Sequence, residues 1–181
     1  MAADPTPHRA HGSAPVSFAP LGVKILSVSD TRDLASDTSG AYLEQTLLAA
    51  GHRVLERRVV KDEVGPIRGA ISEWVREDGV FAIIVTGGTG VLPRDVTPEA
   101  VEPLYDKPLP GFGELFRALS YAEIGAAAIQ SRASAGLVAG RVVFLFPGSA
   151  NACRLALEKI VLPQLDARTP PCSFASLLGG C

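Results

Sequence analysis

The sequence predicts one α/β domain in which helices cover both faces of a mostly parallel sheet. Apolar runs that suit strands alternate along the chain with segments whose apolar residues recur at helical spacing. These runs are rich in β-branched residues, which is typical of strands covered on both faces. A length of 181 residues is enough for one domain with a substantial core. The order strand–helix–strand–helix–strand indicates a doubly wound sheet with right-handed crossovers.

Composition excludes several classes of function. A formal net charge of −2 gives no reason to expect nucleic acid or an acidic membrane as a partner. No apolar run approaches the length of a transmembrane helix, and the first 19 residues lack the apolar core of a secretory signal. The three cysteines are widely spaced and form no CxxC pair, which favours a reducing compartment. We therefore expect a cytoplasmic protein with a disordered leader over residues 1–19.

Three strands and two helices are expected in the first half of the chain. The strands are residues 23–28, 53–60 and 81–85. The segment Asp37-Thr38-Ser39 offers caps for the first helix, which Gly51 ends, and Pro66 opens the second helix. Because the strand over residues 53–60 is polar in the middle, we expect it near an edge of the sheet.

Polar residues follow each of these three strands. Ser29 and Asp30 come after the first strand, and Asp62 and Glu63 come after the second. The glycine-rich run over residues 86–95 follows the third strand. Ligands of open α/β sheets bind outside the carboxyl ends of the strands, so we expect these groups to converge on one edge. The convergence predicts a cleft suited to a metal ion and phosphate.

A glycine-rich turn ends the third strand: Thr86-Gly87-Gly88-Thr89-Gly90. Glycine has no Cβ and tolerates positive φ, so the backbone can approach a ligand closely. Successive free N–H groups in such a turn form a cradle for an anion. The turn lacks the Lys of the P-loop, since Val91 and Leu92 follow it, and it lacks the dinucleotide-binding spacing. Taken alone, it is equally consistent with a plain connection between a strand and a helix.

The sequence of the middle of the chain predicts two more helices and a β-hairpin. A helix is expected from Thr97, as its N-cap, through about Tyr105. A rigid loop over residues 108–114 is expected to precede a short helix. Residues 133–138 and 141–146 are expected to pair as a β-hairpin.

A second glycine turn follows this hairpin, Pro147-Gly148-Ser149. Ser149 is expected to cap a helix over about residues 150–161. Because a helix start after glycine presents free N–H groups, this turn predicts a second anion site. The residues after Pro163 are expected to pack on the domain as a C-terminal extension.

Four ordered motifs resemble the MoaB/MogA family of molybdenum cofactor biosynthesis. They are Thr86-Gly87-Gly88-Thr89-Gly90, Arg94-Asp95-Val96-Thr97-Pro98-Glu99-Ala100, Pro110-Gly111-Phe112-Gly113-Glu114 and Pro147-Gly148-Ser149. The segment Asp37-Thr38-Ser39-Gly40 and residues 163–169 resemble the MoaB branch in particular. The resemblance implies a Rossmann-like three-layer sandwich with a small β-hairpin. It places a molybdopterin-binding domain at residues 20–168, with a C-terminal extension over residues 169–181.

The resemblance also implies an activity. Active members of the family adenylylate molybdopterin with ATP and Mg²⁺ and release pyrophosphate, so a molybdopterin adenylyltransferase is expected here. A non-catalytic molybdopterin-binding or carrier protein of the same fold remains the alternative. The family further implies self-association as a trimer or hexamer and contacts with other proteins of cofactor biosynthesis.

Individual positions take roles from the family motifs. Asp62 and Asp95 are expected to be catalytic, with Asp62 also holding Mg²⁺. Substrate and nucleotide are expected to contact Ser29, Asp30, Thr86, Gly87, Gly88, Thr89, Gly90, Glu114, Gly148 and Ser149. Several of these assignments have structural alternatives: Asp95 could be a cap or a solvated charge near the next helix, and Gly148 and Ser149 could form a helix cap. Asp62 lies in a charged segment typical of solvated loops, and Glu114 could stabilise the start of a helix.

Overall fold

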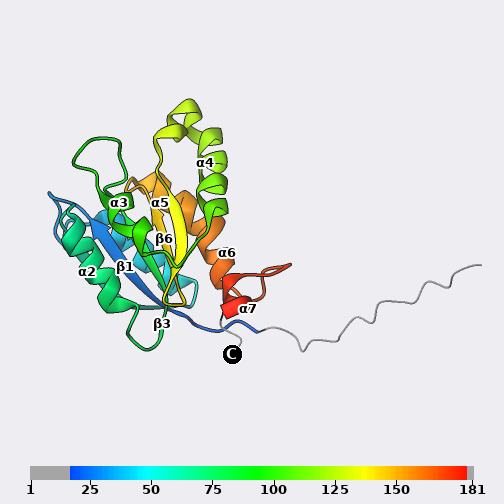
Figure 1. The fold of residues 1–181 in the computed structure, drawn as a ribbon. Coiled ribbons are helices and arrows are strands. Elements are labelled where there is room, and N and C mark those ends of the chain that lie inside the picture. The colour runs from blue at the N-terminus through cyan, green and yellow to red at the C-terminus, as the bar shows by residue number, and fades with distance from the viewer. Residues whose placement is uncertain (1–16, 179–181) are drawn as a thin grey trace, which may run out of the picture.

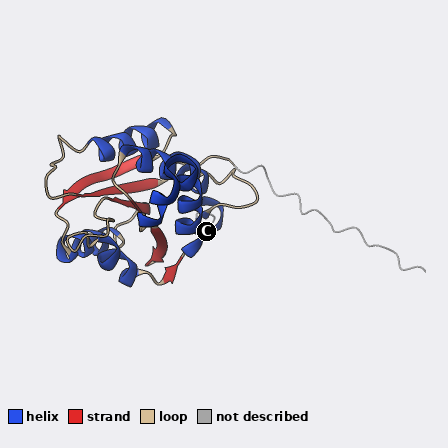
Figure 2. Ribbon diagram, turned by 90° about the horizontal axis from the view of Figure 1, so that it is seen from above, coloured by secondary structure: helices blue, strands red, loops and turns tan. Residues whose placement is uncertain are grey.

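The computed structural model describes residues 17–178, which form a six-stranded sheet with helices on both faces (Figures 1 and 2). The strands are β1 (Gly22–Val28), β2 (Arg53–Val60), β3 (Val80–Thr86), β4 (Lys107–Pro108), β5 (Ser134–Val138) and β6 (Arg141–Phe146). Their order in the sheet is β2-β1-β3-β6-β5-β4. The four strands β2, β1, β3 and β6 are parallel, whereas β5 and β4 are added antiparallel. The predicted fold class, the hairpin and the edge position of residues 53–60 are confirmed.

Seven α-helices surround the sheet within the described residues. They are α1 (Thr38–Ala49), α2 (Val64–Trp74), α3 (Thr97–Val101), α4 (Pro110–Ile124), α5 (Ala150–Ala156), α6 (Leu162–Leu165) and α7 (Phe174–Leu178). Two 3₁₀ helices, Glu102–Leu104 and Gly125–Gln130, follow α3 and α4. A π-helical segment, Leu157–Val161, joins α5 to α6, so the expected helix over residues 150–161 has an α-helical and a π-helical part. None of these helices is long and apolar enough to cross a membrane.

Alternate residues of the strands point to two separate cores, one on each face of the sheet. On one face Ile25 packs in a cluster with Leu43 of α1 and Phe116 of α4. On the other face Leu26 packs in a cluster with Trp74 of α2. All five side chains are at most 1 % exposed, and burial of one such side chain contributes about 1.5–3 kcal/mol. The two cores hold the helices against the sheet and make the predicted three-layer arrangement.

The start of α4 differs from the prediction. The helix begins at Pro110, inside the segment expected to be a loop. A Pro–Gly sequence favours turns, but Pro at the first helical position has a suitable φ and needs no hydrogen-bond donor. Gly113 lies in the first turn, where a Cβ would collide with the carbonyl of Ala133. Glycine therefore allows the helix to approach the chain that enters β5.

The helix after the glycine turn is shorter than expected. The α-helical part ends at Val101, and the next residues form a 3₁₀ turn, where Pro103 has no N–H to donate. Thr97 is the first helical residue and Val96 precedes it as the N-cap, so the predicted cap was wrong by one position. The Thr97 hydroxyl instead donates to Asp62 over 3.4 Å.

Both ends of the described chain pack on the domain. Most of the predicted leader, residues 1–16, lies outside the described residues. The ring of Phe18 lies 5.2 Å from that of His52, between centroids. Near the other end, the ring of Phe174 in α7 lies 6.1 Å from that of Phe144 in the core.

Candidate phosphate-binding site

The carboxyl ends of three neighbouring strands meet at one edge of the sheet. Because β1 lies between β2 and β3, the residues after each strand are side by side. The N–H of Ser29 donates to the carbonyl of Val60 over 2.9 Å. The N–H of Asp62 donates to Oδ1 of Asp30 over 3.0 Å. The predicted convergence of polar strand ends is therefore present.

The carboxylate of Asp62 is fixed against the start of α3. Its Oδ1 accepts hydrogen bonds from the N–H of Val96 over 3.1 Å and from the hydroxyl of Thr97 over 3.4 Å. Burial raises the pKa of Asp62 above its ordinary value, and the negative charges of Asp95 and Asp30 add to the rise. The two hydrogen bonds oppose this shift without cancelling it. Asp62 thus lies near two further carboxylates, of which Asp30 is paired with Arg94.

The glycine turn requires glycine at its first positions. Gly87 has a φ of 97° and Gly88 a φ of 62°, both in the left-handed region that favours glycine. A Cβ on Gly87 would collide with the carbonyl of Val28, and one on Gly88 would collide with Thr97 and Asp62. The turn therefore lies directly against β1 on one side and against Asp62 on the other.

The backbone N–H groups of the turn are arranged to receive a ligand. Gly87 donates its N–H to the carbonyl of Phe146 over 3.3 Å, which ties the turn to β6. Within residues 17–178, no protein acceptor takes the N–H groups of Gly88, Thr89 and Gly90. Consecutive free N–H groups of this kind bind anions.

Asp95 closes the loop that follows the turn. Its N–H donates to the carbonyl of Leu92 over 2.9 Å, and its Oδ2 accepts the N–H of Leu92 over 3.0 Å. A Cβ on Gly90 would collide with the Asp95 carboxylate, so this carboxylate packs on the glycine turn. Asp95 therefore has both a local structural role and a position beside the free N–H groups.

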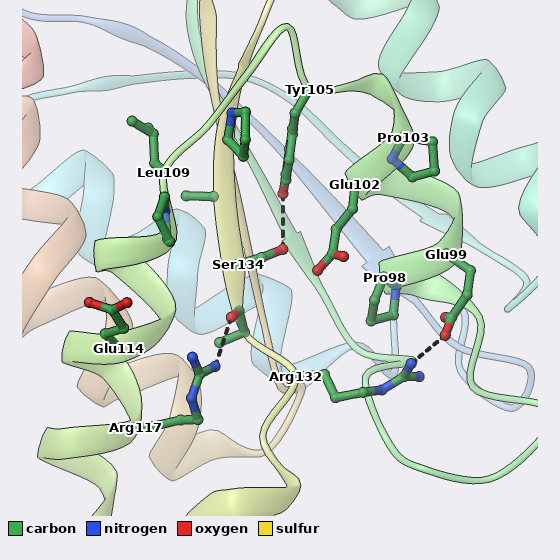
Figure 3. A pocket seen from close by; sticks show the side chains of 14 residues that line it. Pro98, Glu99, Glu102, Pro103, Tyr105, Leu109, Glu114, Arg117, Arg132 and Ser134 are labelled. Carbon is green, nitrogen blue, oxygen red and sulfur yellow. Dashed lines mark hydrogen bonds and ion pairs between the residues drawn. The ribbon is translucent and has the colours of Figure 1, made fainter.

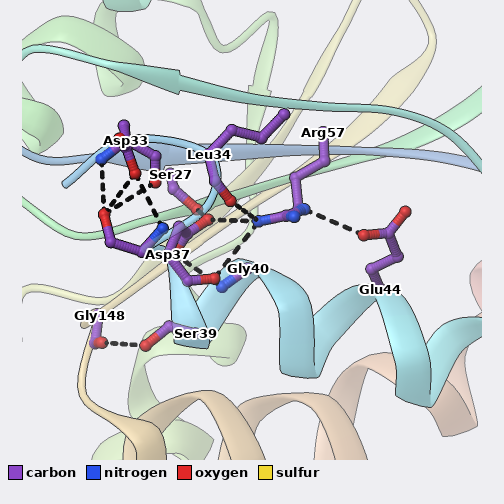
Figure 4. A network of polar contacts seen from close by, with 10 residues as sticks. Ser27, Asp33, Leu34, Asp37, Ser39, Gly40, Glu44, Arg57 and Gly148 are labelled. Carbon is purple, nitrogen blue, oxygen red and sulfur yellow. Dashed lines mark hydrogen bonds and ion pairs between the residues drawn. The ribbon is translucent and has the colours of Figure 1, made fainter.

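The second turn is anchored from two sides. The hydroxyl of Ser39 at the start of α1 donates to the carbonyl of Gly148 over 2.8 Å (Figure 4). Thr86, at the end of β3, donates its hydroxyl to the carbonyl of Pro147 over 3.2 Å. Ser149 caps α5, as predicted. Thr86 is only 2 % exposed, so it supports the second turn from the interior of the domain.

The two turns line a common open cavity. Its volume is about 560 Å³, and its lining includes Ser29, Gly87, Gly88, Thr89, Gly90, Asp95 and Gly148. A Cβ on Gly148 would lie 3.1 Å from Cα of Gly87, so the two turns are in direct contact. Asp30 lines a neighbouring cavity on the β2 side. Most of the predicted ligand-binding residues are therefore brought together.

Of the predicted site residues, Asp30, Asp62, Thr86 and Ser149 do not line this cavity, and neither does Glu114. Glu114 lines a second cavity of about 590 Å³ that lies between α3, α4 and β5 (Figure 3). Glu114 projects from α4 on one side of this cavity, and the ion pair of Arg132 with Glu99 lies on the opposite side. The expected contact of Glu114 with a pterin remains a prediction.

Arg132 is a residue of the site that the sequence did not reveal. Its Nε donates to the carbonyl of Thr89 over 3.2 Å, and its Nη2 donates to the carbonyl of Asp95 over 2.7 Å. Its Nη1 pairs with Glu99. Two of these partners are backbone atoms, 43 and 37 residues away in the chain, so no motif of side chains marks the contact.

A buried ion pair lies behind the cleft, next to α1 (Figure 4). Asp37 is 2 % exposed, and its Oδ2 accepts from the hydroxyl of Ser27 over 2.6 Å and from Nη1 of Arg57 over 3.2 Å. Its Oδ1 caps α1 by accepting the N–H of Gly40 over 2.9 Å. Arg57 also contacts Glu44 over 3.0 Å. This network fixes the start of α1, which carries Ser39.

A mostly parallel sheet with glycine turns and carboxylates at adjoining strand ends is typical of α/β proteins that bind ligands at the carboxyl edge of the sheet. Residues 24–167 match the family described as probable molybdopterin binding domain, and the chain belongs to this family. The membership predicted from the four motifs is thereby confirmed.

Individual relatives agree with this assignment. The chain is 47 % identical over 157 residues to molybdenum cofactor biosynthesis protein B of Escherichia coli K12, covering 87 % of this chain and 92 % of the relative. A crystal structure of molybdenum cofactor biosynthesis protein B has a TM-score of 0.79 and 44 % identity, covering 84 % of this chain and 94 % of the other. The tungsten cofactor synthesizing protein MoaB from Pyrococcus furiosus has a TM-score of 0.69 and 35 % identity, with coverage of 78 % and 91 %.

Proposed function

We propose that this protein binds molybdopterin and transfers an adenylyl group to it from ATP. In this reaction an oxygen of the molybdopterin phosphate forms a bond to the α-phosphorus of ATP. The bond from that phosphorus to the bridging oxygen of the β-phosphate breaks, and pyrophosphate leaves. The observation that carries the proposal is the position of the Asp62 carboxylate against Gly88 of the glycine turn.

The reaction brings two anions together, so the site must neutralise negative charge. The free N–H groups of Gly88, Thr89 and Gly90 would bind phosphate oxygens of ATP. The second turn, at Gly148, is in contact with the first and would bind a further phosphate or the pterin. Because no residue has to become a covalent nucleophile, positioning and charge neutralisation account for most of the rate.

The carboxylates of the cleft fit a divalent cation that is held jointly with phosphate. Within the described residues, no three His, Cys, Asp or Glu side chains are grouped closely enough to form a metal site by themselves. Mg²⁺ commonly binds through one or two carboxylates and completes its coordination with phosphate oxygens and water. Asp62 would hold the ion. Its Oδ1 fixes the carboxylate by accepting hydrogen bonds at the start of α3, and its Oδ2 lies beside Gly88 of the glycine turn. When bound, Mg²⁺ would supply positive charge to the phosphates.

The proposal is tested by incubating the protein with molybdopterin, ATP and MgCl₂ and measuring released pyrophosphate. Pyrophosphate should appear in step with adenylyl-molybdopterin and should require all three additions. Tight binding of molybdopterin without any release of pyrophosphate would contradict the enzymatic proposal.

A non-catalytic carrier of molybdopterin is the second candidate function. The hydrogen bonds of both predicted catalytic carboxylates favour this candidate. Asp62 accepts a hydrogen bond at the start of α3, and Asp95 closes its own loop by accepting the N–H of Leu92. These contacts would exist in a protein that binds but does not react. Restoration of molybdenum cofactor synthesis in cells by the Asp62→Asn variant would support the carrier.

Self-association as a trimer or hexamer belongs to the same proposal. The outer surface of α4 and the 3₁₀ helix after it exposes Leu115, Tyr121, Ile124 and Ile129, between 47 % and 82 % of each side chain. Large exposed apolar side chains concentrated in one segment of the chain favour contact with another protein chain. Light scattering would give the mass, and a monomer at micromolar concentration would exclude this part of the proposal.

A further inference from the structure

The loop between the glycine turn and α3 is exposed, and its conformation depends on a few polar contacts. Val91 and Leu92 are 66 % and 61 % exposed, so the loop has little apolar packing of its own. Asp95 closes the loop locally through Leu92. Such a segment opens readily unless groups from elsewhere hold it, because buried apolar contacts set the cost of local opening.

One side chain from a distant part of the chain holds both ends of this loop. Arg132 lies between the second 3₁₀ helix and β5, and its guanidinium bonds the carbonyls of Thr89 and Asp95. Thr89 precedes the loop and Asp95 ends it, so a single planar group fixes the separation of the two ends. The third bond, to Glu99 in the first turn of α3, orients the guanidinium.

Only a guanidinium among the side chains of proteins offers donors in this rigid fork. Its Nε and its two terminal nitrogens donate in fixed directions, whereas a lysine ammonium is a point charge on a flexible stem. The bond to Arg132 lowers the pKa of Glu99: burial alone would raise it, but the hydrogen bond and charge of Arg132 outweigh that effect. The ion pair is therefore retained at neutral pH.

Arg117 provides an internal comparison. It lines the same cavity as Arg132, and its Nη1 also donates to backbone carbonyls, those of Ser131 over 3.4 Å and Ala133 over 3.1 Å. These carbonyls belong to the segment before β5 and not to the glycine turn. Arg117 therefore supports the scaffold, whereas Arg132 connects the scaffold to the candidate ligand site.

We propose that Arg132 is a positioning residue, which holds the glycine turn and Asp95 in the arrangement that binds the phosphates of ATP. The inference rests on the proposed function, and it adds a residue that lies outside the four motifs named above. Arg132 acts through the backbone of Thr89 and Asp95 and does not itself contact the reacting atoms. Its loss would let the free N–H groups and the Asp95 carboxylate move relative to each other.

The test compares the Arg132→Lys variant with native protein and with the matched Arg117→Lys variant. Hydrogen exchange of the ligand-free proteins should show the hydrogen-bonded amides of Leu92, Asp95 and Val96 exchanging about tenfold faster in Arg132→Lys only. In the pyrophosphate assay, kcat/KM for ATP should fall about tenfold, mainly through KM, with the KM for molybdopterin unchanged within about twofold. Thermal unfolding confirms that each variant is folded.

A second variant keeps the test decisive if Arg132→Lys does not fold. Glu99→Gln removes the charge that orients the guanidinium but leaves both carbonyl contacts, so a smaller increase of exchange, about threefold, is expected at the same amides. Unchanged exchange at the amides of Leu92, Asp95 and Val96, or an equal increase in Arg117→Lys, would overturn the inference. An unchanged KM for ATP would do the same. If native protein releases no pyrophosphate, the proposed function fails, and the exchange comparison alone decides the role of Arg132.

Discussion

Asp37 and Asp62 are two restrained aspartates near the same cleft, and they differ in how their charge is balanced. Asp37 is almost fully buried, yet the guanidinium of Arg57 lies 3.2 Å from its Oδ2. Asp62 is less buried and receives two hydrogen bonds, and its charged neighbours are the carboxylates of Asp95 and of Asp30, the second of which is paired with Arg94. Burial alone therefore does not mark the carboxylate that serves a ligand. A charge left unbalanced by the fold is the one that a bound cation would compensate.

The largest expected effect concerns the stability that Asp37 provides. Asp37→Ala removes the buried carboxylate that pairs with Arg57, accepts from Ser27 and caps α1, so the free energy of unfolding should fall by about 3 kcal/mol. Urea denaturation measures this change. Glu44→Ala is the matched control, because it removes the more exposed partner of Arg57 and should cost less than about 1 kcal/mol. Equal losses of unfolding free energy in the two variants would show that the buried Asp37 stabilises the fold no more than the exposed Glu44.

The next effect concerns activity at Asp62. Asp62→Asn keeps an oxygen that accepts from Val96 but removes the negative charge, so release of pyrophosphate should fall about 100-fold. Unfolding by urea should change by less than about 1 kcal/mol, since the hydrogen bonds of the side chain remain. Glu63→Gln alters the adjoining exposed carboxylate and serves as the control. Comparable losses of activity at both positions would remove the distinction between Asp62 and a solvated charge.

The smallest effect is a pH dependence of stability at Asp62. Its folded-state pKa is raised, so folding favours the protonated carboxyl. The stability this contributes is fully present below the unfolded pKa, about 3.9, and is lost as pH rises through the folded pKa. Asp62→Asn mimics the protonated form. Its stability relative to native protein should therefore increase between about pH 4 and pH 7, as measured by thermal unfolding. A constant difference across this range would contradict the raised pKa.

The sheet and most of the cleft could be predicted because their signals are local in the sequence. Each parallel strand is an apolar run followed by polar or glycine residues, and the rule that ligands gather at carboxyl ends then placed Ser29, Asp62 and the glycine turn together. The start of α4 could not be predicted in this way. Pro110 and Gly111 favour a turn and a helix start alike, and only packing against the chain at Ala133 selects the helix.

The contacts of Arg132 could not be predicted from the sequence, for a different reason. Its acceptors are the carbonyls of Thr89 and Asp95, and every residue type has a carbonyl. A side chain that binds backbone atoms across about forty residues leaves no pattern of partner side chains. The separation of Glu114 from the glycine turn likewise follows from the path of α4 along the far side of the second cavity.

The direct contact between Gly87 and Gly148 also has an evolutionary consequence. A side chain at residue 148 would press on the backbone of the other turn, since its Cβ would lie only 3.1 Å from Cα of Gly87. A side chain at residue 148 therefore requires the first turn to shift, although 61 positions separate Thr86 from Pro147 in the chain. Related chains that recognise a different ligand would have to change both turns together, so these two segments should be inherited as one unit.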